Sequence, residues 1–415
     1  MNYYIAIMVT VKKEGIVLEA TGLEFENQAV LNPAIVQQGN TLHMFYRAVR
    51  KGNHSSIGYC KLDGPLNVVE RGKTPVLFSE FDYEKHGIED PRIVFLDGTY
   101  YLTYTAYDGK NALIAYATSK NLKRWEKKGT ISPRIKYNDI RKIFINSKLK
   151  DRYFFFKSFY KEMRGEDVLL WEKDAFLFPK KFKGKYALIH RILPDIQVIY
   201  FKNFKDLNLK YWEEYLKKLP KHIVLEPRYW YESRNIGGGC PPIETDKGWL
   251  LIYHAVQDTK AGSVYRASVA LLDKKNPREI IGRLENPLFG PEEDWEIQGD
   301  VNNVVFPEGT ALFGDRLYIY YGAADKRIAA VSVNIDELLN ELTKKGQQIE
   351  SHFDISVTAG QIFDACLKQA HSLKQLKELL HKEDTLISMA VGWLVKEGKI
   401  EFLTKKDDIK IKTKE

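Results

Sequence analysis

The fold is decided by one stretch, Leu42-His43-Met44-Phe45-Tyr46-Arg47-Ala48, because its aromatic strand pattern returns four more times along the chain. The related stretches begin at Tyr100, Tyr186, Leu250 and Leu317. Each of the five follows a turn containing Gly with Asp, Asn or Lys, which is typical of a β-hairpin. A second apolar strand follows each stretch, at residues 57–60, 114–117, 196–200, 267–271 and 328–332.

Sheet units that repeat in this way cannot bury their faces alone, so they predict an all-β five-bladed β-propeller. A β-sandwich of many short strands is the alternative. We place the propeller at residues 1–345. Two irregular stretches interrupt the repeat, at about residues 131–171 and 206–218. The second has the apolar spacing of a helix, and both are expected to be insertions on the rim.

Composition indicates which ligands and which cell compartment suit the protein. The 415 residues carry a formal charge of +8, which is compatible with anionic ligands and does not require nucleic acid. The three cysteines are widely separated and lack Cys-x-x-Cys spacing, which argues against disulfides and a zinc site. We therefore expect a reducing compartment and no metal. The apolar run from Tyr3 to Val9 predicts a first strand, and no stretch is long enough to span a membrane. We expect a cytoplasmic protein.

The segment Gly87-Ile88-Glu89-Asp90-Pro91-Arg92-Ile93 is a candidate for the catalytic centre. Pro91 restricts the residue before it, so we expect Asp90 to be extended. Arg92 is expected to pair with a carboxylate such as Glu89 and to tune the proton affinity of Asp90. A strand-entry turn without catalytic function is the alternative for such a triplet.

Alignment of the five aromatic strands predicts a shared funnel. The residues that follow the conserved aromatic or His position in the repeat are Arg47, Thr105, Arg191, His254 and Gly322. Equivalent positions of propeller blades converge on the axis, so two Arg and one His are expected to meet near Asp90. Such a cluster suits an anion or a sugar. The triple glycine at residues 237–239 lacks the spacing of a nucleotide loop and is expected to allow close backbone approach to a ligand, or a tight loop.

These motifs together resemble glycoside hydrolase family 130, the mannoside phosphorylases and related β-mannosidases. The resemblance covers about residues 15–345 and rests on seven motifs. They lie at residues 32–34, 46–48, 89–92, 121–125, 178–188, 237–254 and 322–325. It implies a five-bladed propeller, with Asp90 as the general acid and inorganic phosphate attacking the anomeric carbon with inversion. It places sugar contacts at Asn32, Arg47 and Asp325.

The resemblance also implies a phosphate clamp at Lys173, Arg191 and His254. A fourth clamp position, a Lys in the family pattern, is Asn235 here, with Arg234 beside it. Because hydrolysing members lack parts of this clamp, phosphorolysis and hydrolysis both remain open. An inverting hydrolase needs a second carboxylate, for which Glu244 and Glu285 are candidates.

The last 65 residues change character. Apolar periodicity predicts three helices around residues 362–367, 373–380 and 386–395, followed by strands at 400–403 and 409–412. Three helices and a hairpin predict a small α+β winged-helix domain at residues 351–415. Its eleven Lys and ten acidic residues leave a net charge of 11 − 10 = +1. DNA binding is therefore not expected, and a protein contact or dimerisation is favoured.

The leading interpretation is a phosphorylase that converts β-mannosides such as β-manno-oligosaccharides, with phosphate as co-substrate and no other cofactor, to mannose 1-phosphate. An inverting β-mannosidase is the first alternative. A sugar-binding regulator that uses its winged helix to bind DNA or protein is a more remote one. A homo-oligomer is compatible with all three.

Overall fold

The computed structural model describes residues 9–145, 147, 149–344, 352–405 and 408–414. The chain forms two compact units, residues 1–343 and 344–415, each described here by itself. The strand predicted from Tyr3 to Val9 falls almost wholly on residues 1–8, outside the described residues. The first described strand is β1 (Val11–Leu18).

The first compact unit, residues 1–343, consists mainly of antiparallel strands, which fall into five sheet units of four or five strands each. The first two units contain β2 (Ala29–Gln38), β3 (Thr41–Arg50), β4 (His54–Asp63), β5 (Asn67–Arg71), and β6 (Gly87–Leu96), β7 (Thr99–Tyr107), β8 (Ala112–Ser119), β9 (Glu126–Thr130). The third contains β10 (Lys173–Leu177), β11 (Tyr186–Arg191), β12 (Ile196–Phe201) and β13 (Ile223–Leu225). The fourth contains β14 (Asn235–Gly238), β15 (Ile243–Glu244), β16 (Trp249–Thr259), β17 (Gly262–Leu272) and β18 (Ile280–Arg283). The fifth contains β19 (Val305–Phe313), β20 (Arg316–Ala323), β21 (Arg327–Asn334) and β1.

The two strands predicted for each repeat are confirmed in every unit, as β3 and β4, β7 and β8, β11 and β12, β16 and β17, and β20 and β21. The hairpin before β7 shows the expected turn, with Asp97 and Gly98 at φ of 49° and 70°. The first two units join through one parallel pairing, Ser55 with Gly87. Strand β1 pairs with β21, so a strand from the start of the chain completes the last unit.

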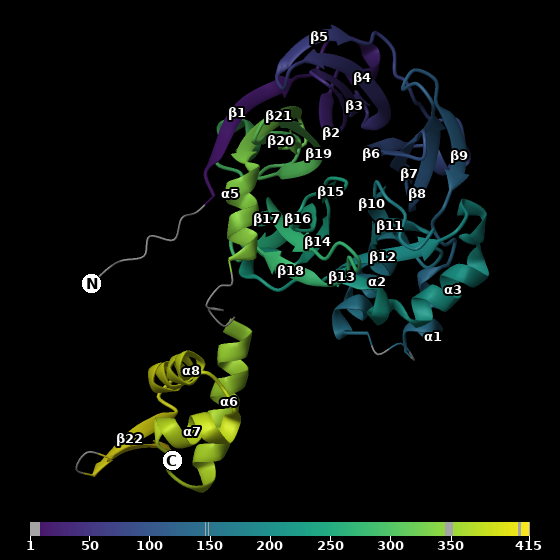
Figure 1. Cartoon of the computed structure of the whole chain (residues 1–415). Helices are drawn as coiled ribbons and strands as arrows, with labels where there is room; N and C mark the ends of the chain where they lie inside the picture. Colours follow the sequence, from purple (N-terminus) through teal and green to yellow (C-terminus); the bar gives the residue numbers. More distant parts are fainter. Residues whose placement is uncertain (1–8, 146, 148, 345–351, 406–407, 415) are drawn as a thin grey trace. The chain divides into compact units, whose positions relative to one another are not determined.

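The units lie around a common centre, toward which β2, β6, β10 and β19 face (Figure 1). An apolar core fills each space between neighbouring units. One core joins the last unit to the first and contains Met44 and Tyr46 of β3 with Tyr320 of β20. The other cores pack units one and two, two and three, three and four, and four and five. Burial of both faces of every sheet is therefore what holds the units side by side.

A buried glutamate ties down the aromatic residue of the repeated strand in four of the units. The bonds from Tyr hydroxyl to Glu carboxylate are Tyr46–Glu26 (2.7 Å), Tyr104–Glu84 (2.6 Å), Tyr253–Glu232 (2.7 Å) and Tyr321–Glu296 (2.5 Å). A cation pairs with each of these glutamates, namely Arg71, Lys127, Arg283 and Lys13. We call this arrangement the Glu–Tyr clamp. It fixes the strand just before the residues aligned above as site candidates.

The third unit has a variant of the Glu–Tyr clamp. His190 replaces the tyrosine, with its Nδ1 2.7 Å from Glu172 Oε1. The other ring nitrogen, Nε2, lies 2.7 Å from the hydroxyl of Tyr215. Tyr215 belongs to the inserted helix α3 (Leu209–Lys217), which confirms the helix predicted there. The insertion therefore supplies a hydroxyl partner for His190, whereas in the other sheet units the outer strand supplies the cation that pairs with the glutamate.

The longer insertion contains two helices, α1 (Tyr137–Phe144) and α2 (Asp151–Arg164), which pack on the core between the second and third units. Two further helices are α4 (Asp294–Ile297) and α5 (Ile335–Thr343).

The second compact unit, residues 344–415, contains three helices, α6 (His352–Lys368), α7 (Leu373–Leu380) and α8 (Asp384–Lys396). The hairpin of β22 (Ile400–Lys405) and β23 (Asp408–Thr413) follows them. The predicted three helices and two strands are confirmed. They share a core that includes Ile362, Leu376, Ile387 and Ile411.

Candidate functional site

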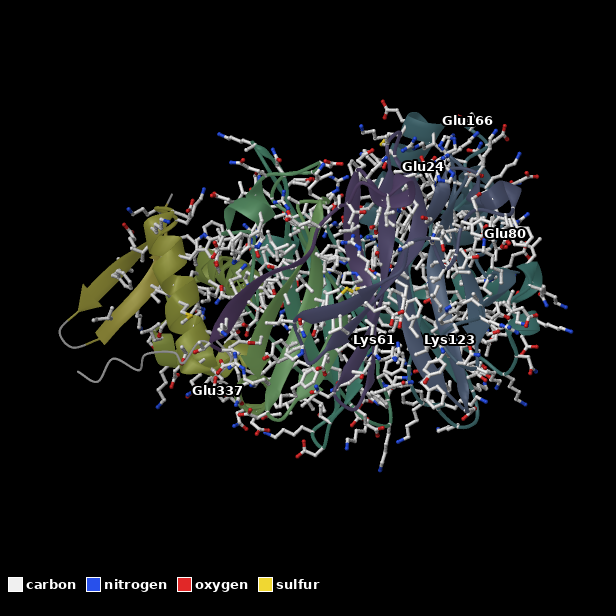
Figure 2. The ribbon with its side chains drawn as sticks, turned by 90° about the horizontal axis from the view of Figure 1, so that it is seen from above. Glu24, Lys61, Glu80, Lys123, Glu166 and Glu337 are labelled. Carbon is white, nitrogen blue, oxygen red and sulfur yellow. The ribbon has the colours of Figure 1, made fainter. Side chains whose placement is uncertain are left out.

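Four labelled residues mark two opposite faces of the first compact unit, residues 1–343. Seen edge-on in Figure 2, Glu24 and Glu166 lie toward one face, whereas Lys61 and Lys123 lie toward the other. Glu24 belongs to the 3₁₀ turn that leads into β2, one of the strands that face the common centre.

Irregularities in the inner strands turn polar side chains toward the centre. Register shifts occur in β2, β6 and β10, and within them Asn32, Asp90 and Asp174 have φ values of 53°, 53° and 57°. The expected extended conformation of Asp90 is wrong. A bulge places Asp90 in the left-handed region, which Asn and Asp tolerate better than other residues.

Asp90 lies among hydrogen-bond donors and cations. Asn32 Nδ2 donates to Asp90 Oδ1 at 2.8 Å, and Arg47 Nη1 lies 3.4 Å from the same oxygen. Burial raises the pKa of the Asp90 carboxyl, but Arg47, Lys173 and Arg92 together lower it to about 2. Asp90 is therefore an ionised carboxylate at neutral pH.

Glu89 links the surroundings of Asp90 to Lys173. Arg47 Nη2 donates to Glu89 Oε1 at 2.8 Å, and Lys173 Nζ donates to Glu89 Oε2 at 3.1 Å. The negative charges of Glu89 and Asp90 raise the pKa of Lys173 against the effect of burial, which lowers it. Both cations are therefore charged and held in fixed positions.

Arg191 and His254 meet around a second buried acid, Asp174. Arg191 Nη1 lies 2.7 Å from Asp174 Oδ2 and 3.4 Å from His254 Nε2. Burial lowers the pKa of His254 to about 3, with Asp174 opposing that effect and Arg191 adding to it. His254 is therefore neutral, and its Nε2 accepts a hydrogen bond from Arg191. Phe306 packs against the His254 ring at 4.3 Å between centroids.

Arg92 connects the group around Asp90 with the group around Asp174. Its guanidinium donates to the backbone carbonyls of Asp90, Gly238 and Gly239 at 3.0–3.1 Å. It also lies 3.4 Å from Asp174 Oδ1 and 3.0 Å from Glu308 Oε1. Arg92 therefore pairs with carboxylates and lowers the pKa of Asp90, as expected, but its partners are Asp174 and Glu308 in place of Glu89. The side chain is directed inward, where it bridges the inner strands of several units.

The triple glycine permits close approach, as the sequence indicated. A Cβ at Gly237 would lie 2.4 Å from both Asp174 Oδ2 and His254 Cε1. A Cβ at Gly239 would lie 2.9 Å from backbone oxygens of Ile252 and Pro307. The glycines make room for the buried acid and the imidazole, and for neighbouring strands.

Asp325 follows β20 and has a φ of 48°. Burial raises the pKa of its carboxyl to about 6, with Arg47 opposing this and the carboxylates of Asp90 and Glu89 adding to it. In the described part of the chain its carboxylate makes no hydrogen bond or ion pair. Gly322 lies beside Asn32, whose Oδ1 would be 2.1 Å from a Cβ at that position.

Three further candidates, Asn235, Glu244 and Glu285, have surroundings of their own. Asn235 is nearly buried at the start of β14 and pairs with Val256. Glu244 forms an ion pair with Lys180 on the surface, and Glu285 is exposed. Among the described residues neither glutamate contacts the cluster around Asp90.

Sequence reasoning missed Asp174 and Glu308 and did not assign Glu89. Burial raises the pKa of Glu308, and the guanidinium of Arg92 beside it opposes that effect. Alignment of the repeats could have identified Asp174, because it stands at the same bulge position in β10 as Asn32 in β2 and Asp90 in β6.

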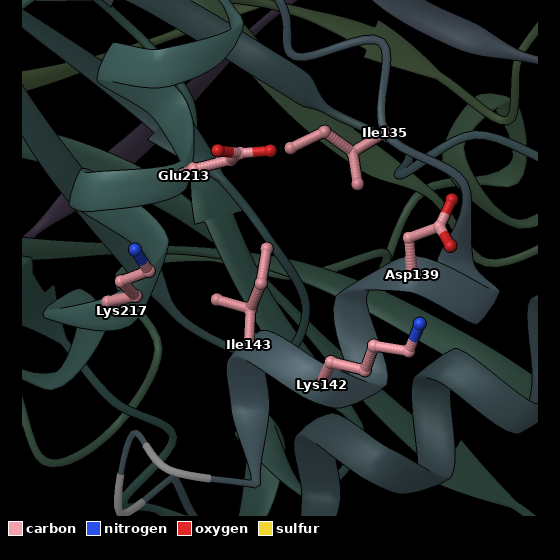
Figure 3. A pocket seen from close by; sticks show the side chains of 6 residues that line it. All are labelled: Ile135, Asp139, Lys142, Ile143, Glu213 and Lys217. Carbon is pink, nitrogen blue, oxygen red and sulfur yellow. The ribbon is translucent and has the colours of Figure 1, made fainter.

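A pocket of about 460 Å³ lies away from this centre, between α1 and α3 (Figure 3). Its lining mixes apolar and oppositely charged side chains, namely Ile135, Asp139, Lys142, Ile143, Glu213 and Lys217. Within the described ranges, no group of three or more His, Cys, Asp or Glu could hold a metal ion. No described helix is long and apolar enough to cross a membrane.

Two family models match the chain. The glycoside hydrolase family 130 model, described as beta-1,4-mannooligosaccharide phosphorylase, matches residues 14–165 and 158–344. A model described as a winged helix-turn-helix domain matches residues 349–413.

Curated relatives carry related names. A 1,2-beta-oligomannan phosphorylase of Thermoanaerobacter sp. (strain X514) is 36% identical over 327 residues, which is 76% of this chain and 93% of the relative. A beta-1,2-mannobiose phosphorylase of the same strain is 35% identical over 334 residues, with the same coverage. The solved beta-1,2-mannobiose phosphorylase from Listeria innocua, in complex with beta-1,2-mannobiose, is 21% identical. It has a TM-score of 0.61 and covers 80% of this chain and 99% of that one, which shows a shared fold.

Proposed function

The chain belongs to glycoside hydrolase family 130, and we propose that it is a phosphorylase that cleaves β-mannosides with inorganic phosphate. The relatives named for β-1,2-linked substrates are similar along nearly their whole length, so a β-1,2-manno-oligosaccharide is the proposed substrate. The products are mannose 1-phosphate and a manno-oligosaccharide shortened by one residue.

One observation carries this proposal. The cations Lys173 and Arg191 lie beside Asp90, joined to it through Glu89 on one side and through Asp174 and Arg92 on the other. A carboxyl group at Asp90 beside an anion-binding cluster of cations suits attack by phosphate. Attack by water would need a second carboxylate as base, and the two glutamates considered for that role, Glu244 and Glu285, do not contact the cluster around Asp90 among the described residues.

The proposed roles follow from these positions. Asn32, Arg47 and Asp325 bind the sugar at the anomeric end, while Lys173, Arg191 and neutral His254 bind phosphate. A phosphate oxygen forms a bond to the anomeric carbon as the glycosidic C–O bond breaks on the opposite face. The leaving oxygen takes a proton from Asp90, relayed through a sugar hydroxyl, and solvent later returns a proton to Asp90.

Phosphate itself can supply the conditions for this proton transfer. The nearby cations keep Asp90 ionised, with a pKa of about 2. Bound phosphate brings negative charge to Lys173 and so weakens the effect that lowers the pKa of Asp90. The proposed order therefore couples anion binding to protonation of the acid.

The proposal extends to the architecture. The five sheet units, with a core between each neighbouring pair, are proposed to form a closed five-bladed β-propeller at residues 1–345. The winged-helix domain at residues 351–415 is proposed to make protein contacts or a homo-oligomer rather than to bind DNA. Phosphate is the proposed co-substrate, with no other cofactor, and the cytoplasm is the proposed location.

Product analysis tests this function. The full chain would be incubated with β-1,2- and β-1,4-linked manno-oligosaccharides, with and without inorganic phosphate. Mannose 1-phosphate that forms in step with phosphate consumption is the expected result. Equal cleavage without phosphate would instead support an inverting β-mannosidase, which the neutral Asn235 at a clamp position favours.

A further inference from the structure

Arg234 is a cation beside the phosphate site with no role in the scheme above. It immediately precedes Asn235, the neutral residue at the position where the family pattern has a lysine. Its backbone N–H donates to the carbonyl of Val256 at 2.9 Å, so the residue extends the pairing of β14 with β16. Arg234 is therefore the residue directly before β14, the strand that begins at the position of the missing lysine.

The inserted helix α2 holds Arg234 in place. Arg152 of α2 donates to the backbone carbonyls of Ser233 and Arg234 at 2.6 and 2.5 Å. The guanidinium of Arg234 lies 5.7 Å from the centre of the Phe159 ring, also in α2. Both the backbone and the side chain of Arg234 are therefore positioned by the insertion.

The opposite side of the guanidinium contacts the hairpin between β16 and β17. Arg234 Nη1 donates to Asp258 Oδ1 and to Ser263 Oγ, each at 3.2 Å. Within the described residues Nε and Nη2 donate no hydrogen bond, and about a third of the side chain is exposed (32%). Part of the guanidinium is therefore available to a ligand.

A continuous set of ring contacts connects this helix to the phosphate site. Phe159 packs on Tyr160 at 5.5 Å, and Tyr160 packs on Trp171 at 4.6 Å. The ammonium of Lys173 lies 5.8 Å from the Trp171 ring. The insertion thus forms a wall that begins at Arg234 and ends at Lys173.

Tyr160 shows how close the cations are. This side chain is almost buried, and burial raises the pKa of its hydroxyl, while Arg191, Lys173 and Arg234 each lower it. Three cations therefore lie within electrostatic reach of one hydroxyl.

We propose that Arg234, held by helix α2, is a further phosphate-binding cation that takes the place of the lysine absent at Asn235. This inference rests on the proposed phosphorolysis. It assigns the longer insertion a role in the site. It also implies that a neutral residue at position 235 is compatible with phosphorolysis, because the charge comes from the neighbouring residue.

The test compares Arg234→Gln with wild type and with Asp258→Asn, using KM for inorganic phosphate, KM for the mannoside and the thermal midpoint. Arg234→Gln removes the cation, whereas Asp258→Asn weakens the same ion pair and leaves the cation. We expect Arg234→Gln to raise KM for phosphate about 10- to 100-fold, since a charge-assisted hydrogen bond is lost. KM for the mannoside should change little, and Asp258→Asn should keep or lower KM for phosphate.

A purely structural Arg234 would give a different pattern. Both variants would then lower the thermal midpoint alike and leave KM for phosphate unchanged, which would overturn the inference. Phosphate titration by calorimetry gives the same comparison without turnover. If wild type cleaves mannosides without phosphate, the proposed function fails first and this inference falls with it. If wild type requires phosphate and Arg234→Gln binds it normally, this inference alone fails.

Discussion

Substitution of Asp90 by Asn changes both the proton donor and the charge balance around it. Asparagine keeps the size of the side chain and its contact with Asn32, but it has no proton to donate. General acid catalysis typically contributes about 10²–10⁴-fold in rate, so we expect a loss of that order in phosphate-dependent turnover. The variant should still fold, because the remaining cluster is intact.

The same variant has an expected cost in stability. The pKa of Asp90 falls from 3.8 to about 2 in the folded protein, and a shift of roughly two pKa units corresponds to about 2 kcal/mol favouring the ionised form. Because the folded pKa is depressed, this contribution is present above pH 4 and is lost as the pH falls toward 2. Asp90→Asn should therefore be less stable than wild type by about 2 kcal/mol at pH 7.

Urea denaturation of both proteins at pH 7 and pH 3, together with initial rates at saturating phosphate, measures these effects. The stability difference should narrow at pH 3. Near-normal turnover by folded Asp90→Asn would remove Asp90 as the general acid. A variant more stable than wild type at pH 7 would show that the cations do not stabilise the carboxylate as described.

Three other substitutions separate the site from the scaffold. Gly237→Ala should raise KM for phosphate at least about tenfold and lower the thermal midpoint, because the new Cβ would lie 2.4 Å from His254; unchanged phosphate kinetics would contradict this packing. Tyr253→Phe removes the 2.7 Å bond to Glu232 and should cost about 1–3 kcal/mol in urea unfolding, with KM values unchanged if the Glu–Tyr clamp is only structural. Asp325→Asn should raise the thermal midpoint at pH 7 but not at pH 4, while weakening mannoside binding. The pKa of Asp325 is raised from 3.8 to about 6, so the fold loses stability as the pH rises from about 4 to 6 and the full loss is present at pH 7; a lower midpoint of the variant at pH 7 would refute the assignment.

Local pattern was enough to predict the strand pairs, the helix at Leu209–Lys217 and the helices and hairpin of the last 65 residues. These elements have apolar periodicity that does not depend on distant partners. The Glu–Tyr clamp was also visible in principle. Its glutamates precede the tyrosines by 20, 20, 21 and 25 residues, but they lie in single helical turns that are too short to carry a periodic signal.

The centre of the site was harder to predict, since it depends on contacts across the whole chain. Arg92 meets Asp174, Gly239 and Glu308, which lie 82, 147 and 308 − 92 = 216 residues away, so nothing near it in sequence indicates these partners. The bulge that sets Asp90 at φ 53° overrides the usual preference of a residue before proline. The sequence resemblance named Asp90, Lys173, Arg191 and His254, but the acids that hold these cations in position required the structure.

Proton NMR of the first products formed from β-1,2-mannobiose, with and without inorganic phosphate, tests the central claim most directly. Single displacement by phosphate opposite Asp90 predicts α-mannose 1-phosphate in equal amount to released mannose, and no cleavage without phosphate. The β anomer of mannose 1-phosphate, or mannose released at the same rate in both conditions, would contradict inverting phosphorolysis at this site.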